Sequence, residues 1–186
     1  MQTLIKAYFE YQNDPAGVMY RLVHERHFGA ALLGYLVAAV CWVCFFWIGS
    51  ALTTWGFIWR FLFFWLLEIT LGYLWAALSG LFLSFFSHEN GSSTLFITLG
   101  LSGFVQSLLL CFTLCAAKFP GLSVLAGLAV AITFVLRLSF AVLNTARAGQ
   151  VGLNKALGAF CFVLVPAGAA MCLFIGTIIL LISLAV

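Results

Sequence analysis

The stretch FIWRFLFFWLLEITLGYLW, residues 57–75, is almost entirely apolar and decides the fold class. A membrane-spanning helix needs about 20 such residues, each advancing about 1.5 Å along the axis. Two charged residues, Arg60 and Glu68, interrupt this stretch. Because an ionised side chain inside hydrocarbon is costly, each of them needs a partner or a route to the headgroups.

The composition of the whole chain indicates a membrane location. Of its 186 residues, 65% are hydrophobic and 7% are charged. Soluble domains typically carry about 25% charged residues. So little charge does not cover a soluble surface, and the sequence therefore predicts an integral, all-α membrane protein.

Five apolar runs are long enough to span a bilayer, and they form a predicted transmembrane domain over residues 28–186. The second run is the longest, so its helix must tilt, kink or protrude. Polar or Pro–Gly breaks separate the runs, and the longest predicted loop is NTARAGQVGLNK, 144–155. The expected spans of this five-transmembrane-helix bundle are about 28–50, 57–86, 95–117, 121–143 and 156–183.

Residues 1–27 form a predicted cytoplasmic N-terminal segment. Polar and charged residues are mixed along it, so we expect no cleaved signal peptide. Pro15 suits the first position of a helix that Asn13 or Asp14 caps. Apolar residues then recur at helical spacing among Arg21, Glu25 and Arg26, which predicts a short amphipathic helix in the membrane interface. They are Val18, Met19, Leu22 and Val23. An ordinary polar tail is the alternative.

The lysine and arginine distribution predicts the orientation, because cytoplasmic segments carry the excess of these residues. With the N-terminus inside, five basic residues lie on the cytoplasmic side, against Lys118 and Arg60 on the other. We therefore expect a cytoplasmic N-terminus and a C-terminus outside. The five inner residues are Lys6, Arg21, Arg26, Arg147 and Lys155.

Small residues at four-residue spacing predict where the helices approach one another closely, since lipid-embedded helices associate through close packing. Such stripes occur on the first, second, third and fifth spans. The first carries Ala30, Gly34 and Ala38; the second Gly72, Ala76, Gly80 and Ser84; the third Gly103, Ser107, Cys111 and Cys115; the fifth Gly168, Cys172 and Gly176.

Glu68 is the charged residue with the deepest predicted position in the second span. Arg60 can snorkel to the headgroups, and it lies about 12 Å and about 80° away from Glu68 on an ideal helix. Arg137, on the fourth span, is the better partner by depth, so we predict a Glu68–Arg137 pair. Protonation of Glu68 is the alternative, and Gln106 on the third span is a further buried polar candidate.

No pattern typical of catalysis is present. The cysteine pair of CWVC, 41–44, has the spacing of a metal half-site but no second half, and buried cysteines act as small hydrophobes. The sequence shows no phosphate-binding loop and no His–Glu-x-x-His spacing. We therefore expect no enzyme, cofactor, metal, nucleotide or nucleic acid, and expect lipids and other membrane proteins, or a second copy, as partners.

Three segments resemble the Yip (Ypt/Rab-interacting protein) domain family, particularly its small bacterial members. They are DPAGVMYRLVHERHF, 14–28; NGSSTLFITLGLSGFVQSLLL, 90–110; and LRLSFAVLNTARAGQVGLNKALGAF, 136–160. Gln106 stands where the family has a proline, and the tyrosine-rich eukaryotic signature is absent. The resemblance implies five spans, a cytoplasmic N-terminus, a bacterial inner-membrane location and a non-catalytic protein that associates with other membrane proteins.

These observations predict a membrane scaffold or a partner subunit of a larger membrane assembly. The alternative is a small transporter or channel, in which an intramembrane polar network of Glu68, Arg137 and Gln106 would line a path.

Overall fold

The computed structural model describes residues 9–10, 13–47, 53–86, 92–112, 123–148 and 150–166. Within these ranges the regular structure is helical, with no strand. The labelled elements are α2 (Pro15–His24), α3 (Phe28–Trp47), α4 (Thr54–Ser84), α5 (Ser92–Ser102), η1 (Gly103–Ser107) and α7 (Ser123–Ala148). A further apolar helix covers Leu153–Pro166.

Four helices in the described part of the chain are long and apolar enough to cross a membrane. They cover Phe28–Phe45, Thr54–Ser84, Ser92–Phe112 and Gly127–Arg147. They correspond to the first four predicted spans. The fifth predicted span is described only as far as Pro166, so its larger part, with Gly168 and Gly176, lies outside the described residues.

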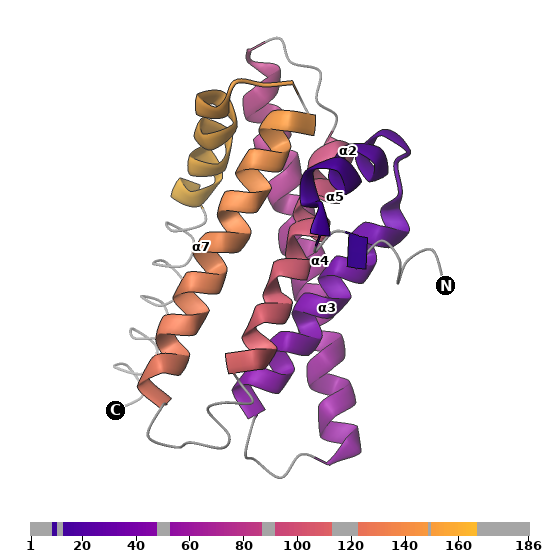
Figure 1. The fold of residues 1–186 in the computed structure, drawn as a ribbon, viewed down its shortest axis with the longest axis vertical. Helices are drawn as coiled ribbons and strands as arrows, with labels where there is room; N and C mark the ends of the chain where they lie inside the picture. The colour runs from indigo at the N-terminus through magenta and orange to yellow at the C-terminus, as the bar shows by residue number, and fades with distance from the viewer. Residues whose placement is uncertain are drawn as a thin grey trace, which may run out of the picture.

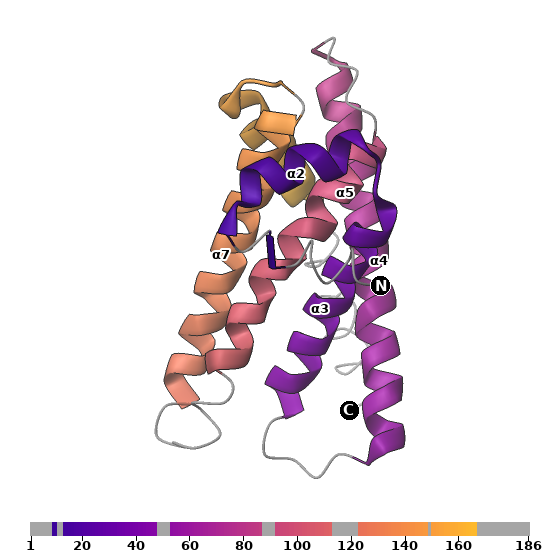
Figure 2. The ribbon, with the colours of Figure 1, turned by 45° about the vertical axis from the view of Figure 1, so that its right-hand side comes forward.

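The four long helices run side by side along the long axis of the molecule, while α2 lies across α5 and α7 near one end (Figures 1 and 2). Helices α3, α4 and α5 all pack against one another, and α7 packs on α5 and η1. Helices α4 and α7 form no comparable contact with each other. Helices α4 and α7 are therefore joined mainly through α5, on which both of them pack.

The crossing of α3 and α5 brings two backbones into direct contact. A Cβ atom added to Gly34 would lie 1.9 Å from the carbonyl oxygen of Gly100, and one added to Gly103 would lie 2.6 Å from that of Gly34. A Cβ atom on Gly100 would meet Ala31 at 2.7 Å. Only glycine fits at these positions, so the predicted positions Gly34 and Gly103 lie at a close approach that also needs Gly100.

The predicted stripe on the third span does not continue past Gly103. Ser107 is half-buried and Cys111 is exposed. The reason is η1, which has the tighter 3₁₀ winding of about 3.0 residues per turn, so that a four-residue spacing no longer repeats on one face.

The predicted stripe on α4 packs unevenly. Gly72 lies under the ring of Tyr35, where an added Cβ atom would be 2.6 Å from Cζ. Ala76 is buried at 1% exposure. At Gly80 the nearest atom to an added Cβ is 3.6 Å away, which is an ordinary van der Waals contact. Close approach along α4 is therefore required at Gly72 and not at Gly80.

Helix α2 forms as predicted, with Pro15 in its first turn and Asp14 as its N-cap, but its apolar face contacts protein. The Asp14 carboxylate accepts a hydrogen bond from the Gly17 amide at 3.0 Å. The face carrying Val18 and Leu22 is buried in a cluster with residues of α3, α5 and η1. The bundle itself therefore covers the apolar face of α2, and the position of this helix in the membrane interface stays a prediction.

The two arginines of this segment have local roles. Arg21 forms an ion pair with Glu10. Arg26 follows the end of α2 with a φ of 52°, in the left-handed region. Its amide donates to the Val23 carbonyl at 3.1 Å, while that of His27 donates to Leu22 at 2.9 Å, the pattern of a Schellman motif. Arg26 therefore belongs to the turn into α3.

Two predicted loop boundaries are wrong. Helix α7 continues to Ala148, although residues 144–155 were predicted as a loop, because Asn144 and Thr145 are helical and buried at 2% exposure each. Helix α4 begins at Thr54, before the expected start of the second span at residue 57, and the Thr53 hydroxyl caps it by accepting from the Gly56 amide at 3.2 Å. Short polar residues are typical of loops, but here Asn144 and Thr145 are buried in a helix and Thr53 caps one.

Candidate functional site

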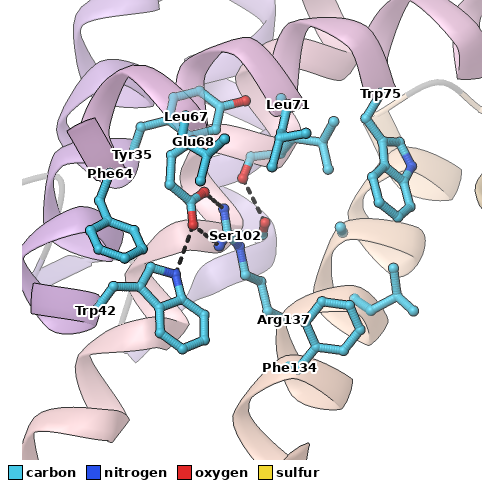
Figure 3. A pocket seen from close by; sticks show the side chains of 14 residues that line it. Tyr35, Trp42, Phe64, Leu67, Glu68, Leu71, Trp75, Ser102, Phe134 and Arg137 are labelled. Carbon is cyan, nitrogen blue, oxygen red and sulfur yellow. Dashed lines mark hydrogen bonds and ion pairs between the residues drawn. The ribbon is translucent and has the colours of Figure 1, made fainter. Parts of the chain in front are cut away.

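The structure brings Glu68 of α4 and Arg137 of α7 together in a bidentate ion pair. Arg137 Nη1 donates to Glu68 Oε1 at 3.0 Å, and Nη2 donates to Oε2 at 2.7 Å. Two parallel charge-assisted hydrogen bonds are the strongest arrangement for these side chains. Figure 3 shows the two groups pointing toward each other from facing helices.

Trp42 of α3 is the third member of this cluster. Its indole Nε1 donates to Glu68 Oε1 at 2.9 Å, so that oxygen accepts two hydrogen bonds (Figure 3). Three different helices therefore meet at one carboxylate. Composition and spacing did not point to Trp42, because a tryptophan in an apolar run is indistinguishable from a packing residue.

The cluster lies deep in the bundle. Arg137 is 14 residues from the start of α7 and 11 from its end, or about 21 Å and about 16 Å along the axis. The side chains of Arg137 and Glu68 are 17% and 13% exposed. An unpaired charge at such a depth in a bilayer costs about 3 kcal/mol or more, which explains why the two residues occur together.

The ion pair lines a cavity of about 350 Å³ between α4 and α7. Helix α4 supplies one wall and α7 the opposite wall, while α3 and α5 lie behind. The residues around the ion pair are mostly aromatic or aliphatic, and Leu67, Leu71 and Phe134 are also exposed at the molecular surface. The other lining residues are Tyr35, Trp42, Phe64, Gly72, Trp75, Leu99, Ser102, Leu138 and Ala141.

Tyr35 fixes the back wall of the cavity. It is fully buried, its ring covers Gly72, and its hydroxyl donates to the Phe96 carbonyl at 3.1 Å. One side chain of α3 thus touches α4 and α5 at the same level. A tyrosine in a predicted span gave no sign of this role, and Gly72 on the neighbouring span predicted a close approach of helices, where the structure places the ring of Tyr35.

Gln106 does not join the ion pair. It is 1% exposed, but neither its Oε1 nor its Nε2 atom has a hydrogen-bond partner among the described residues. It lies in η1 and does not line the cavity. The predicted three-residue polar network therefore contains only Glu68 and Arg137, with Trp42 in the place expected for Gln106.

The described residues contain no cluster of three or more His, Cys, Asp or Glu side chains that could hold a metal ion. Cys41 and Cys44, the pair with half-site spacing, are both free thiols. The polar interactions of this site, in the described part of the chain, are thus an ion pair and hydrogen bonds inside an apolar cavity.

The fold and this site define an all-helical chain with apolar helices of membrane-spanning length, compatible with an integral membrane protein. Comparison with known protein families, curated proteins and solved structures found no match to the chain.

Proposed function

We propose that this chain is a five-span inner-membrane protein of the Yip type that acts, without catalysis, as a scaffold or partner subunit of a membrane assembly. The resemblance of residues 14–28, 90–110 and 136–160 to that family supports the fold. The helix Leu153–Pro166 supports the fifth span, because it is the apolar beginning of the predicted run 156–183.

The observation that carries the proposed role is the outward face of α4. Only Gly72, Ala76, Ser79 and Leu83 of this helix are buried. The opposite face bears exposed side chains at three- and four-residue spacing, which places them in one stripe. The stripe consists of Trp55, Trp59, Phe63, Leu66, Thr70 and Tyr73. Aromatic side chains of this kind are enriched where proteins contact one another.

The charge distribution supports the orientation. Arg21, Arg26, Arg147 and Lys155 lie in or beside α2, the end of α7 and the start of the helix Leu153–Pro166. These segments are at the same end of the molecule (Figures 1 and 2). The positive-inside rule associates such a basic end with the cytoplasm, which supports the proposed orientation with the N-terminal segment inside and the C-terminus of a fifth span outside.

Site-specific photocrosslinking in native membranes tests the partner role. A photoreactive residue replaces Phe63 in the α4 stripe or, as the control, Val135, which is equally exposed on α7 at 60% against 62%. We expect position 63 to crosslink to a distinct protein, either another membrane protein or a second copy, and position 135 to yield mainly lipid adducts. Only lipid adducts at both positions would contradict the proposal.

A small transporter is the second candidate, because a charged pair lines a cavity within the bundle. A polar path would need further hydrogen-bonding groups beyond the pair, and Gln106 does not supply one. Flux measurements in liposomes decide between the two functions. Substrate-dependent flux that is lost in Glu68→Gln would support transport and contradict the scaffold.

A further inference from the structure

We propose that the cavity between α4 and α7 binds a flat, uncharged ring compound that carries a carbonyl oxygen, of the chemical class of the membrane quinones. This inference is independent of the partner role, since it concerns the interior of the bundle and not the outward face of α4. Its starting point is the unused hydrogen-bonding capacity of Arg137.

A guanidinium group has five N–H donors. Arg137 uses two of them on Glu68, and no other acceptor is found among the described residues. Arg137 lines the cavity, so its three remaining N–H donors are available to an acceptor bound there, and such an acceptor would offset the cost of leaving polar groups unpaired in apolar surroundings. Glu68, by contrast, already accepts three hydrogen bonds, two from Arg137 and one from Trp42. The complementary ligand group is therefore an acceptor.

The ligand must also be uncharged and largely apolar. The Glu68–Arg137 pair is neutral as a unit, so an additional ionic group at this depth would be unbalanced in the hydrocarbon layer. The volume of about 350 Å³ falls in the range of small-molecule pockets. Such a pocket, apolar with a few convergent polar groups, is the usual form of a ligand site.

The walls favour a flat ring over an acyl chain. Five aromatic side chains line the cavity: Tyr35, Trp42, Phe64, Trp75 and Phe134. Aromatic rings interact best with other flat rings in offset-stacked or edge-to-face arrangements. Access is available from the membrane side, because Leu67, Leu71 and Phe134 both line the cavity and are exposed on the surface.

The test measures binding of a decyl-substituted benzoquinone to the purified full chain in nanodiscs of saturated phosphatidylcholine. Leu67→Trp fills the mouth of the cavity, while Leu66→Trp adds the same ring at the neighbouring exposed position, which does not line it. Arg137→Lys keeps the positive charge and removes most of the free donors. The parent chain and Leu66→Trp should each bind one quinone saturably.

Arg137→Lys should bind about tenfold more weakly or worse, the loss expected when a hydrogen bond to a charged donor disappears. Leu67→Trp should bind at least as weakly, because its ring occupies the mouth of the cavity. If Arg137→Lys does not fold, the pair Leu67→Trp and Leu66→Trp decides alone. Non-saturable uptake, or equal binding by Leu67→Trp and Leu66→Trp, would overturn the proposal.

Discussion

The two sides of this bundle are held together by opposite means. At the α3–α5 crossing, Gly34, Gly100 and Gly103 allow backbone to touch backbone. Between α4 and α7 the backbones stay apart, and the side chains of Glu68 and Arg137 bridge a cavity of about 350 Å³. Apolar surface gives little driving force for association in lipid, so close packing and polar pairing are the two remaining means. The molecule uses one on each side.

This difference assigns different tasks to the two sides. Where the backbones of α3 and α5 touch, there is no cavity and no side chain that could change its rotamer. The α3–α5 side therefore acts as a rigid support. A bridge of two long side chains leaves lined space next to it, so the α4–α7 side is where a ligand can enter. Substitutions that remove one of these interactions at a time should show whether the two sides differ in this way.

The largest effect is expected at the ion pair. Glu68→Leu leaves Arg137 buried without its carboxylate, and we expect the free energy of unfolding, measured by steric trapping in bicelles, to fall by about 3–5 kcal/mol. The double variant Glu68→Leu/Arg137→Met should recover most of this loss, because no uncompensated charge remains.

Glu25→Gln is the control for that experiment. Glu25 pairs with His27 at 2.8 Å, but both side chains are about half exposed. Exposed pairs contribute about 1 kcal/mol or less. If Glu68→Leu were as mild as Glu25→Gln, then the ion pair would not be what joins α4 to α7.

The next effect tests the backbone crossing. Gly34→Ala places a methyl group 1.9 Å from the Gly100 carbonyl oxygen, which forces α3 and α5 apart. Overpacking of this kind costs about 3 kcal/mol at the upper end, and neighbouring backbone cannot rotate away as a side chain can. Gly127→Ala on α7 is the matched control, because an added Cβ atom there meets nothing within 4 Å. Equal thermal midpoints for the two variants in detergent would contradict the crossing.

The third comparison concerns Gly72 of α4, on which the Tyr35 ring of α3 packs. Gly72→Ala pushes a methyl group into the ring of Tyr35, at 2.6 Å from Cζ, and we expect a loss of about 2 kcal/mol in unfolding free energy. Gly80→Ala, two turns along the same helix, has its nearest contact at 3.6 Å and should be tolerated. A stripe that acted uniformly, as the residue spacing alone suggests, would make both variants equally damaging.

The parts of the fold that sequence can predict are those governed by hydropathy and by the cost of burying a charge. Four spans follow from runs of apolar residues, and the Glu68–Arg137 pair follows from depth and charge. Spacing also indicates Gly34, Gly72 and Gly103. Each of these conclusions depends on the sequence of a single helix or, for the ion pair, on the similar depths of Glu68 and Arg137 in their predicted spans.

The features that could not be predicted depend on contacts between helices. Gly100 becomes essential because of where α3 crosses, and Trp42 becomes a hydrogen-bond donor because of where Glu68 points. The 3₁₀ winding of η1 moves Ser107 away from the packed face, and Asn144 is helical because its surroundings bury it. A one-dimensional pattern contains none of this information.

The smallest expected effect concerns the hydrogen bond that Trp42 donates to Glu68. Trp42 and Trp75 both line it, but only the indole N–H of Trp42 reaches Glu68, whereas Nε1 of Trp75 has no partner among the described residues. Trp42→Phe should therefore lower the unfolding free energy by about 1.5 kcal/mol more than Trp75→Phe, the contribution of a hydrogen bond to a charged acceptor. Both substitutions shorten a ring in the same cavity, so the difference reports the lost Trp42 hydrogen bond together with the removal of the unpaired Trp75 N–H. Equal losses would mean that the carboxylate is held by Arg137 alone, and that the α4–α7 side is a two-helix bridge to which α3 contributes only packing.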